Sequence, residues 1–254
     1  MLEKLSKNFN KKRAFDPFTL NKIVNKISIF FKEADYVLDL GCGSGRILIP
    51  LAERLPSVNF LGIDISSGML SVAKKYLEKR GLKNIHFAQQ DMNDDKWVRA
   101  LPEKSFNGII LFQSIHFASN TYRLLDVVSK LLKENGVIII ASTSHKQFFG
   151  LPYCKAFPGA LELELNRTPD TQSLILFLRI KGFRAIINEQ IEVKINFKNH
   201  EEIKKWLYSK PFSALTVCKE NSFDKGVEKF LSMVDKNVLV DKFSLIVFRK
   251  FSAS

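Results

Sequence analysis

Short apolar runs alternate with amphipathic segments from about residue 36 to residue 141. The runs predict five strands, at Tyr36–Leu40, Asn59–Ile63, Ile85–Ala88, Gly108–Phe112 and Val137–Ala141. Strands separated by helical segments are typical of βαβ units, which build a parallel sheet. Because the runs are apolar almost throughout, we expect helices to cover both faces of that sheet.

The amphipathic segments between these strands predict three helices. The first covers Gly45–Leu55. The second follows Ser66 or Ser67, since either side chain can cap a helix, and it ends at Gly81. The third carries apolar residues at helical spacing up to Leu131, and we expect it to end at Gly136.

The pattern loosens after residue 142. Residues 144–170 hold Gly150, Gly159 and three prolines, and we interpret them as an insertion. Beyond them the pattern predicts a helix at Thr171–Lys181 and a long strand or strand pair within residues 182–197. The remaining predicted elements are helices at Glu201–Tyr208 and Phe223–Val234 and a last strand at Phe243–Arg249.

The stretch "VLDLGCGSGR" places three glycines directly after the first predicted strand. Gly41, Gly43 and Gly45 allow the backbone to approach a ligand closely, and the start of the following helix favours negative charge. Such a loop alone is a weak signal. Arg46 stands where a dinucleotide-binding loop has its last glycine, and the loop lacks the Lys-Ser/Thr pair of a P-loop.

Acidic residues follow the next two strands. Asp64 ends the second strand and can accept hydrogen bonds from a ribose diol. Asp91, in "QQDM", follows the third strand and should face the same crevice. Either acid alone is as consistent with a turn or a helix cap. The glycine loop and both acids at successive strand ends together favour a nucleoside site.

The chain resembles the class I S-adenosylmethionine-dependent methyltransferases. The segments "VLDLGCGSGR", "GIDISSGML", "AQQDMND" and "GIILFQSIHF" match motifs of that family in order and spacing, over roughly residues 34–142. The resemblance implies an α/β fold of the Rossmann-like kind, with a seven-stranded, mostly parallel sheet in the order 3-2-1-4-5-7-6, helices on both faces, and the last strand antiparallel. We accordingly expect one domain over residues 1–254, with an N-terminal arm (1–33), a cofactor-binding core (34–142) and a substrate-side part (143–254).

The resemblance also implies which residues hold S-adenosylmethionine. The loop with Gly41, Gly43 and Gly45 would run along its methionine part, and Asp64 would bind its ribose. The residues expected around the adenine and the methionine side chain are Ile65, Met69, Asp91, Met92 and Phe112. Arg13 of the N-terminal arm could pair with the cofactor carboxylate, with Phe15 or Phe18 over the pocket; a solvated basic arm is an equal alternative.

The sequence contains weaker signals for the acceptor site than for the cofactor site. His116 follows the fourth strand and is the candidate catalytic residue, as a base or as a hydrogen-bond donor. His145 holds a similar place after the fifth strand. In the insertion, Tyr153 would line the acceptor pocket and Arg167 could hold a carboxylate, although a plain packing layer fits these residues equally well.

Composition narrows the choice of partner and compartment. The net charge of +13 is compatible with nucleic acid, but the chain has only one tight basic cluster, at Lys11–Arg13. Three unpaired cysteines argue against a disulfide framework and a structural metal site. No apolar run is long enough to cross a membrane, and we expect a cytoplasmic protein.

Three functions remain open at this stage. We favour transfer of a methyl group to a small-molecule acceptor, with S-adenosylhomocysteine as the product. The alternatives are an RNA or protein methyltransferase that uses the basic arm and the C-terminal half, and a non-catalytic cofactor-binding protein. An arsenite methyltransferase is disfavoured, because Cys42 belongs to the glycine loop rather than to a thiol cluster.

Overall fold

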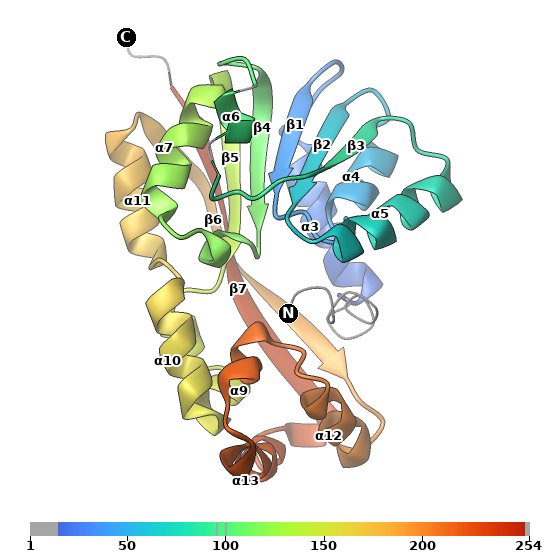
Figure 1. Ribbon diagram of the computed structural model, residues 1–254, viewed down its shortest axis with the longest axis vertical. Helices are drawn as coiled ribbons and strands as arrows, with labels where there is room; N and C mark the ends of the chain where they lie inside the picture. Colours follow the sequence, from blue (N-terminus) through green and yellow to red (C-terminus); the bar gives the residue numbers. More distant parts are fainter. Residues whose placement is uncertain (1–14, 95, 100, 252–254) are drawn as a thin grey trace.

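A computed structural model describes residues 15–94, 96–99 and 101–251. Seven strands form one sheet in the order β3-β2-β1-β4-β5-β7-β6 (Figure 1). The strands are β1 (Tyr36–Leu40), β2 (Asn59–Asp64), β3 (Ile85–Gln89), β4 (Phe106–Phe112), β5 (Leu132–Ser142), β6 (Phe183–Asn196) and β7 (Val238–Lys250). The expected order is confirmed, and the segment before residue 197 is one long strand.

The strands differ in direction between the two parts of the sheet. Strands β1 to β5 are joined through helices and pair in parallel. Strand β7 pairs antiparallel with both β5 and β6. All five parallel strands therefore end at the same edge of the sheet, which is where ligands bind in open α/β folds.

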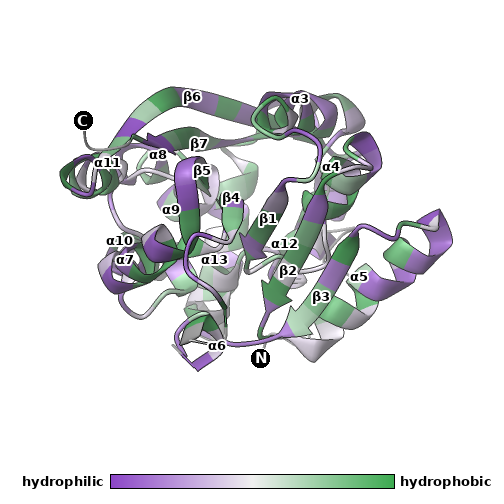
Figure 2. Ribbon diagram, turned by 90° about the horizontal axis from the view of Figure 1, so that it is seen from above, coloured by the Kyte–Doolittle hydropathy of each residue, from purple (hydrophilic) through white to green (hydrophobic). Residues whose placement is uncertain are grey.

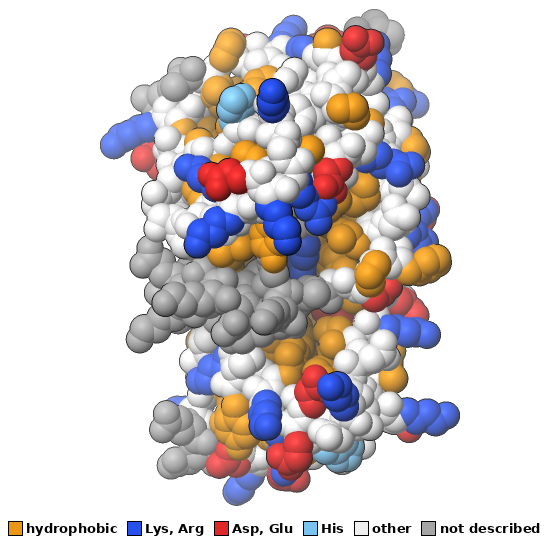
Figure 3. Space-filling view, turned by 90° about the vertical axis from the view of Figure 1, so that its right-hand side faces the viewer, with side chains coloured by type: hydrophobic (Ala, Val, Ile, Leu, Met, Phe, Trp, Pro, Cys, Tyr) orange, Lys and Arg blue, Asp and Glu red, His pale blue; other side chains and the backbone are white. Residues whose placement is uncertain are grey.

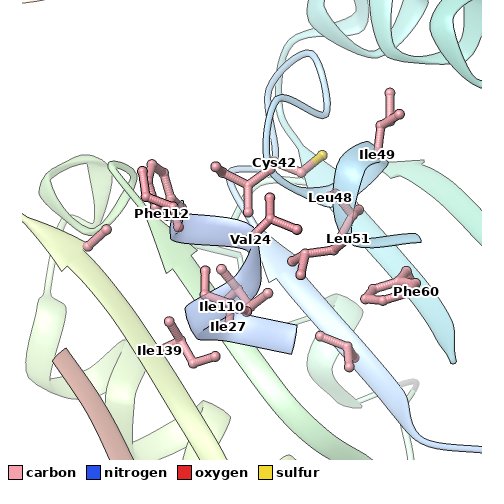
Figure 4. Close-up of a cluster of buried hydrophobic side chains, with 14 of the residues drawn as sticks. Val24, Ile27, Cys42, Leu48, Ile49, Leu51, Phe60, Ile110, Phe112 and Ile139 are labelled. Atoms are coloured by element: carbon pink, nitrogen blue, oxygen red, sulfur yellow. The ribbon is translucent and has the colours of Figure 1, made fainter. Parts of the chain in front are cut away.

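Helices cover both faces of the sheet, as the apolar strands predicted (Figures 1 and 2). On one face lie α3 (Pro17–Ser28), α4 (Leu48–Arg54) and α5 (Ser67–Arg80), and on the other lie α6 (Lys96–Arg99), α7 (Thr121–Leu131) and α11 (Thr171–Ile180). Figure 4 shows the first of these two cores, in which Val24 and Ile27 of α3 meet Ile110 and Ile139 of the sheet. Each fully buried aliphatic side chain contributes about 1.5–3 kcal/mol.

The ends of the helices have local causes. Ser66 caps α5, because its Oγ accepts a hydrogen bond of 3.3 Å from the Met69 N–H. Gly81 ends this helix with a φ of 62°, as expected. Several predicted boundaries were wrong, including two next to glycines. Helix α4 begins at Leu48 rather than Gly45, and α7 ends at Leu131 rather than at Gly136, since the chain from Leu132 already pairs with β4.

The C-terminal part of the chain builds a second lobe below the sheet (Figure 1). Its elements are α8 (His145–Phe148), α9 (Pro152–Ala156), α10 (Pro158–Arg167), α12 (His200–Tyr208), η2 (Ser213–Val217), α13 (Glu220–Leu231) and η3 (Asp235–Asn237). They share a separate buried cluster that includes Leu207 and Phe230. The long pair β6–β7 runs from the sheet into this lobe, and hydrophobic side chains are visible between the two parts (Figure 3).

The segment that we interpreted as an insertion, residues 144–170, is mostly helical and belongs to this lobe. It follows β5 directly, so it lies beside the edge where the parallel strands end. Among the described residues, no helix is long and apolar enough to span a membrane.

Candidate functional site

A cavity of about 280 Å³ opens at the edge where the parallel strands end. Its volume is close to the lower end of the range of about 300–1,000 Å³ that small-molecule sites occupy. The predicted cofactor residues that line it are Gly41, Gly43, Asp64, Ile65, Met69, Asp91, Met92 and Phe112. Four separate strand ends thus place these side chains around one space.

The three glycines of the loop after β1 share a backbone conformation but differ in what surrounds them. All three have positive φ, which L side chains rarely adopt. A Cβ on Gly41 would lie 2.5 Å from Ser114 Cβ, and one on Gly45 would lie 2.7 Å from Ile49 Cδ1. A Cβ on Gly43 would meet nothing within 4 Å. Because Gly43 lines the cavity, a side chain there would occupy ligand space, whereas Gly45 serves the packing of α4.

We expect Gly41→Ala to lower the free energy of unfolding by about 2 kcal/mol, because both the positive φ and the contact with Ser114 penalise a methyl group. Urea denaturation measures the effect. Gly159→Ala is the matched control: this position lies in the first turn of α10, has open space around it, and should tolerate alanine. Equal stability of the Gly41 variant and the wild type would contradict the loop geometry.

Asp64 ties the glycine loop to the end of β2. Its Oδ2 accepts a hydrogen bond of 2.8 Å from the Gly43 N–H, and its Oδ1 accepts one of 2.8 Å from the Ser66 N–H. Burial raises the pKa of Asp64, and these two N–H groups act against that rise. A carboxylate oxygen can accept more than one hydrogen bond, so both oxygens keep the capacity to accept a ribose hydroxyl.

Asp91 is held in the turn after β3. Its Oδ1 accepts hydrogen bonds from the backbone and side-chain amides of Asn93, at 2.9 and 3.1 Å. Its carbonyl oxygen accepts a hydrogen bond of 2.8 Å from Trp97 Nε1. The turn is therefore fixed from both sides, with Asp91 and Met92 at the wall of the cavity.

Asp39 is a residue of this cavity that the sequence interpretation missed. It lies within β1, is 2% exposed, and its Oδ1 has no hydrogen-bond partner. Burial, and secondarily the charge of Asp64, raise the pKa of Asp39 to about 8. Burial also raises the pKa of the neighbouring Cys42 thiol. The acid inside the apolar run "VLDL" was the available signal, because a lone buried carboxyl requires a reason.

An aromatic group closes the cavity on the side of β4. Phe112 packs against Phe15 and Phe243, with ring centroids 5.9 and 5.6 Å apart. The guanidinium of Arg46 lies 4.2 Å from the centre of the Phe15 ring. Phe15 thus backs the pocket wall, whereas Phe18 is 80% exposed and does not. Arg13 lies outside the described residues, so its pairing with the cofactor stays a prediction.

A second, smaller cavity of about 30 Å³ adjoins the first one. The residues that line both are Gln113, His116 and Ser213. His116 lies in the short helix η1 (Ile115–Phe117), which follows β4. Gln113 has a φ of 54°, an uncommon conformation for a residue with a side chain, and such residues are frequent at functional sites. The predicted catalytic residue therefore lies between the two spaces.

Tyr153 and Arg167 line the second cavity, but each has an internal partner. Arg167 donates to both oxygens of Glu164, at 2.8 and 2.9 Å, and to Ser213 Oγ at 2.9 Å. Tyr153 Oη donates to Glu164 Oε1 at 3.2 Å, and its ring stacks on Phe212. The carboxylate that Arg167 holds here belongs to the chain itself. A role for either residue in acceptor binding stays a prediction.

His145 lies at the start of α8 and lines neither of the two cavities. Its Nε2 is 2.7 Å from the Thr168 carbonyl oxygen, and this contact holds the end of α10 against α8. A role for His145 in acceptor binding stays a prediction. Pro211 and Ser213, which do line the first cavity, come from the second lobe, and no local sequence pattern marks them.

The residues of the first cavity fit the cofactor that the sequence resemblance implies. The unobstructed Gly43, the acids at the ends of β2 and β3, and the partnerless buried oxygen of Asp39 suit a polar, partly cationic ligand with a ribose. Within residues 15–94, 96–99 and 101–251, no group of three or more His, Cys, Asp or Glu side chains could hold a metal ion.

Comparisons with known proteins agree with this geometry. The family model described as "Methyltransferase domain" matches residues 31–173. The demethylmenaquinone methyltransferase of Lactococcus lactis is 29% identical over 59% of this chain and 66% of its own length. The tRNA (guanine-N(7)-)-methyltransferase of Helicobacter pylori is 36% identical over 35% of this chain and 21% of its own. The chain thus matches less than two thirds of each relative.

Solved structures share the fold. The YcgJ protein from Bacillus subtilis superposes with a TM-score of 0.65 and 15% identity, over 94% of this chain and 100% of that one. At this level of identity the likeness concerns the fold alone.

Proposed function

This chain belongs to the class I S-adenosylmethionine-dependent methyltransferases, and we propose that it transfers a methyl group to a small-molecule acceptor. When bound, S-adenosylmethionine supplies a methyl group activated by its sulfonium sulfur. Such a transfer depends mainly on holding donor and acceptor in line and excluding water. The chain's own residues supply that positioning.

We assign the first cavity to the cofactor. Asp64 accepts hydrogen bonds from the ribose hydroxyls, and Asp91 lies on the adenine side of the cavity together with Ile65 and Met69. The glycine loop runs along the methionine part of the cofactor. Phe112, backed by Phe15 and Phe243, keeps water from the side on which the methyl group is transferred.

The observation that carries the small-molecule proposal is the second cavity, which adjoins the first across His116. It holds about 30 Å³, and the second lobe contributes most of its wall. An acceptor that reaches it must insert a small group between the sheet and this lobe. The β6–β7 pair runs through both parts, and we propose that they act as one domain.

A tRNA acceptor is the second candidate, since the relative from Helicobacter pylori acts on tRNA by its name. The charges at the second cavity do not favour a tRNA acceptor. Among the described residues of its wall, Glu164 and Asp241 are the acids and Arg167 is the one Lys or Arg, whereas phosphate groups are recognised by an excess of Lys and Arg. We therefore favour the small molecule.

Turnover of the cofactor tests the proposal directly. The purified chain is incubated with S-adenosylmethionine and either a metabolite extract passed through a 3-kDa filter or total tRNA, and S-adenosylhomocysteine is quantified. We expect acceptor-dependent product with the filtered extract, absent in an Asp64→Ala variant. Product with tRNA alone would instead establish the second candidate, and product with neither would leave a protein acceptor or a non-catalytic cofactor-binding protein.

We expect His116→Ala to lower kcat/KM for the acceptor by about tenfold, the effect of one lost hydrogen bond, because His116 lies where the two cavities meet. Affinity for S-adenosylhomocysteine should stay within about twofold. His86→Ala is the matched control, since this histidine lies in β3 and lines neither cavity. Equal kcat/KM in the His116 variant and the wild type would remove His116 from the site.

A further inference from the structure

Two residues that line the second cavity carry buried hydroxyl groups without partners. Ser142, at the end of β5, is 2% exposed, and Thr168, just after α10, is 3% exposed. Neither Ser142 Oγ nor Thr168 Oγ1 has a hydrogen-bond partner, and both residues line the cavity. A buried hydroxyl that makes no hydrogen bond costs about 1–3 kcal/mol, so two beside one space indicate that something polar fills it.

The remaining polar groups of the wall define which polar group fits. Glu164 and Asp241 supply carboxylate oxygens, which only accept hydrogen bonds. Arg167, the one Lys or Arg among the described residues of the wall, is engaged by Glu164 and Ser213 and is held in place by them. The wall also holds donors, such as the side-chain amide of Gln113, so its charges rather than a shortage of donors distinguish the candidate ligands.

Charge separates the candidate ligands further. The space of about 30 Å³ has room for about two water molecules or one small polar group. Its wall holds two carboxylates and one guanidinium, and the guanidinium of Arg167 is already paired with Glu164. A carboxylate placed there would be buried beside like charges, which is costly. A group bearing N–H or O–H would instead donate to the wall and accept from the hydroxyls of Ser142 and Thr168.

We propose that the second cavity is the specificity pocket for the acceptor, and that it takes a hydrogen-bond-donating amide, hydroxyl or amino group and rejects a carboxylate. This inference rests on the proposed function, since it places the acceptor next to His116. It replaces the expectation that Arg167 holds a carboxylate of the acceptor. Ser142 and Thr168 become the residues that contact the inserted group.

Acetamide and acetate form a matched pair of probes, with nearly equal shape and different charge. The protein saturated with S-adenosylhomocysteine is titrated with each probe, and binding is followed by saturation-transfer NMR. We expect acetamide to bind in the millimolar range and at least fivefold more tightly than acetate. Acetate binding as well as acetamide, or no binding of acetamide at 100 mM, would overturn the proposal.

Variants of Ser142 and Thr168 test whether acetamide binds in the second cavity. The double variant Ser142→Ala with Thr168→Val keeps the volume of the wall nearly unchanged and removes both hydroxyls, and we expect it to weaken acetamide binding at least fivefold. Ser105→Ala is the matched control, because Ser105 Oγ is also buried without a partner but lies outside both cavities. Equal effects of the two changes would contradict the assignment.

Two further readouts separate the possible failures. A melting temperature and an S-adenosylhomocysteine affinity equal to the wild type establish that the double variant is folded; if it does not fold, the comparison of acetamide with acetate in the wild type still decides. A crystal soaked in acetamide that keeps only ordered water in the cavity would also overturn the proposal. Since these measurements need no turnover, they are independent of the methyl-transfer assay.

Discussion

Asp64→Ala is expected to weaken the binding of S-adenosylhomocysteine by about 100-fold. Two effects combine. The variant loses the charged hydrogen bonds to the ribose, worth about 1.5–3 kcal/mol each. It also frees the Gly43 N–H, whose 2.8 Å hydrogen bond to Asp64 Oδ2 holds the glycine loop in place. A loss of about 3 kcal/mol corresponds to roughly two orders of magnitude in Kd.

Isothermal titration calorimetry measures this loss, and Asp94→Ala is its matched control. Asp94 is an exposed acid in the turn after β3 that does not line the cavity, so its removal should leave Kd within about twofold. Asp64→Asn separates the two effects, since an amide oxygen can still accept one hydrogen bond. An unchanged Kd in Asp64→Ala would exclude Asp64 as the ribose-binding residue.

Asp39→Asn is expected to remove most of the loss of stability that the ligand-free protein shows between pH 4 and pH 8. The folded-state pKa of Asp39 is about 8, whereas an unfolded chain releases this proton near pH 4. Between these values the folded state binds more protons than the unfolded state, so the free energy of unfolding falls as pH rises. The full difference is on the order of 5 kcal/mol, and asparagine, which does not ionise, avoids it.

Urea denaturation at a series of pH values tests this expectation. The stability of Asp39→Asn relative to the wild type should increase steadily from pH 4 to pH 8. Asp126→Asn is the control with a pKa shift in the opposite direction, because the hydrogen bond from Lys181 lowers the pKa of Asp126. Its stabilising effect is already complete above the unfolded pKa, so this variant should differ from the wild type by a constant amount. A constant difference for Asp39→Asn as well would contradict its raised pKa.

The same carboxyl connects stability to function. Asp39 lines the first cavity and is buried next to Asp64, so holding it there costs stability that grows as the pH rises above about 4 and is complete above about 8. A cationic ligand beside Asp39 favours its ionised form. We therefore interpret Asp39 as a residue retained for ligand binding at the expense of stability at neutral and alkaline pH.

The cofactor half of the site could be predicted because its residues follow single strands. Gly41, Asp64 and Asp91 each lie at a strand end, and parallel strands end at one edge, so the sequence order of the motifs is sufficient to bring them together. The use of a glycine to predict a helix end failed at Gly136, because pairing of Leu132 with β4 began the strand earlier than the glycine suggested. Local signals mark tendencies, and long-range pairing decides between them.

The acceptor half depended on contacts between distant segments. Ser142 of β5, Thr168 after α10 and Asp241 of β7 meet only because the β6–β7 pair carries the second lobe against the edge of the sheet. The pairing of Arg167 with Glu164 is different, because the two residues lie three positions apart on α10 and their spacing in the sequence already allowed this ion pair.

The sequence by itself thus determined the fold class, the strand order through its family resemblance, and most of the residues that meet at the first cavity. Only the tertiary structure decided which residues line the second cavity and which are buried without partners. The physical reason is that glycine conformation and strand-end position are properties of a few consecutive residues. Burial, pKa and hydrogen-bond satisfaction instead depend on side chains that are far apart in the chain and meet only in the folded molecule.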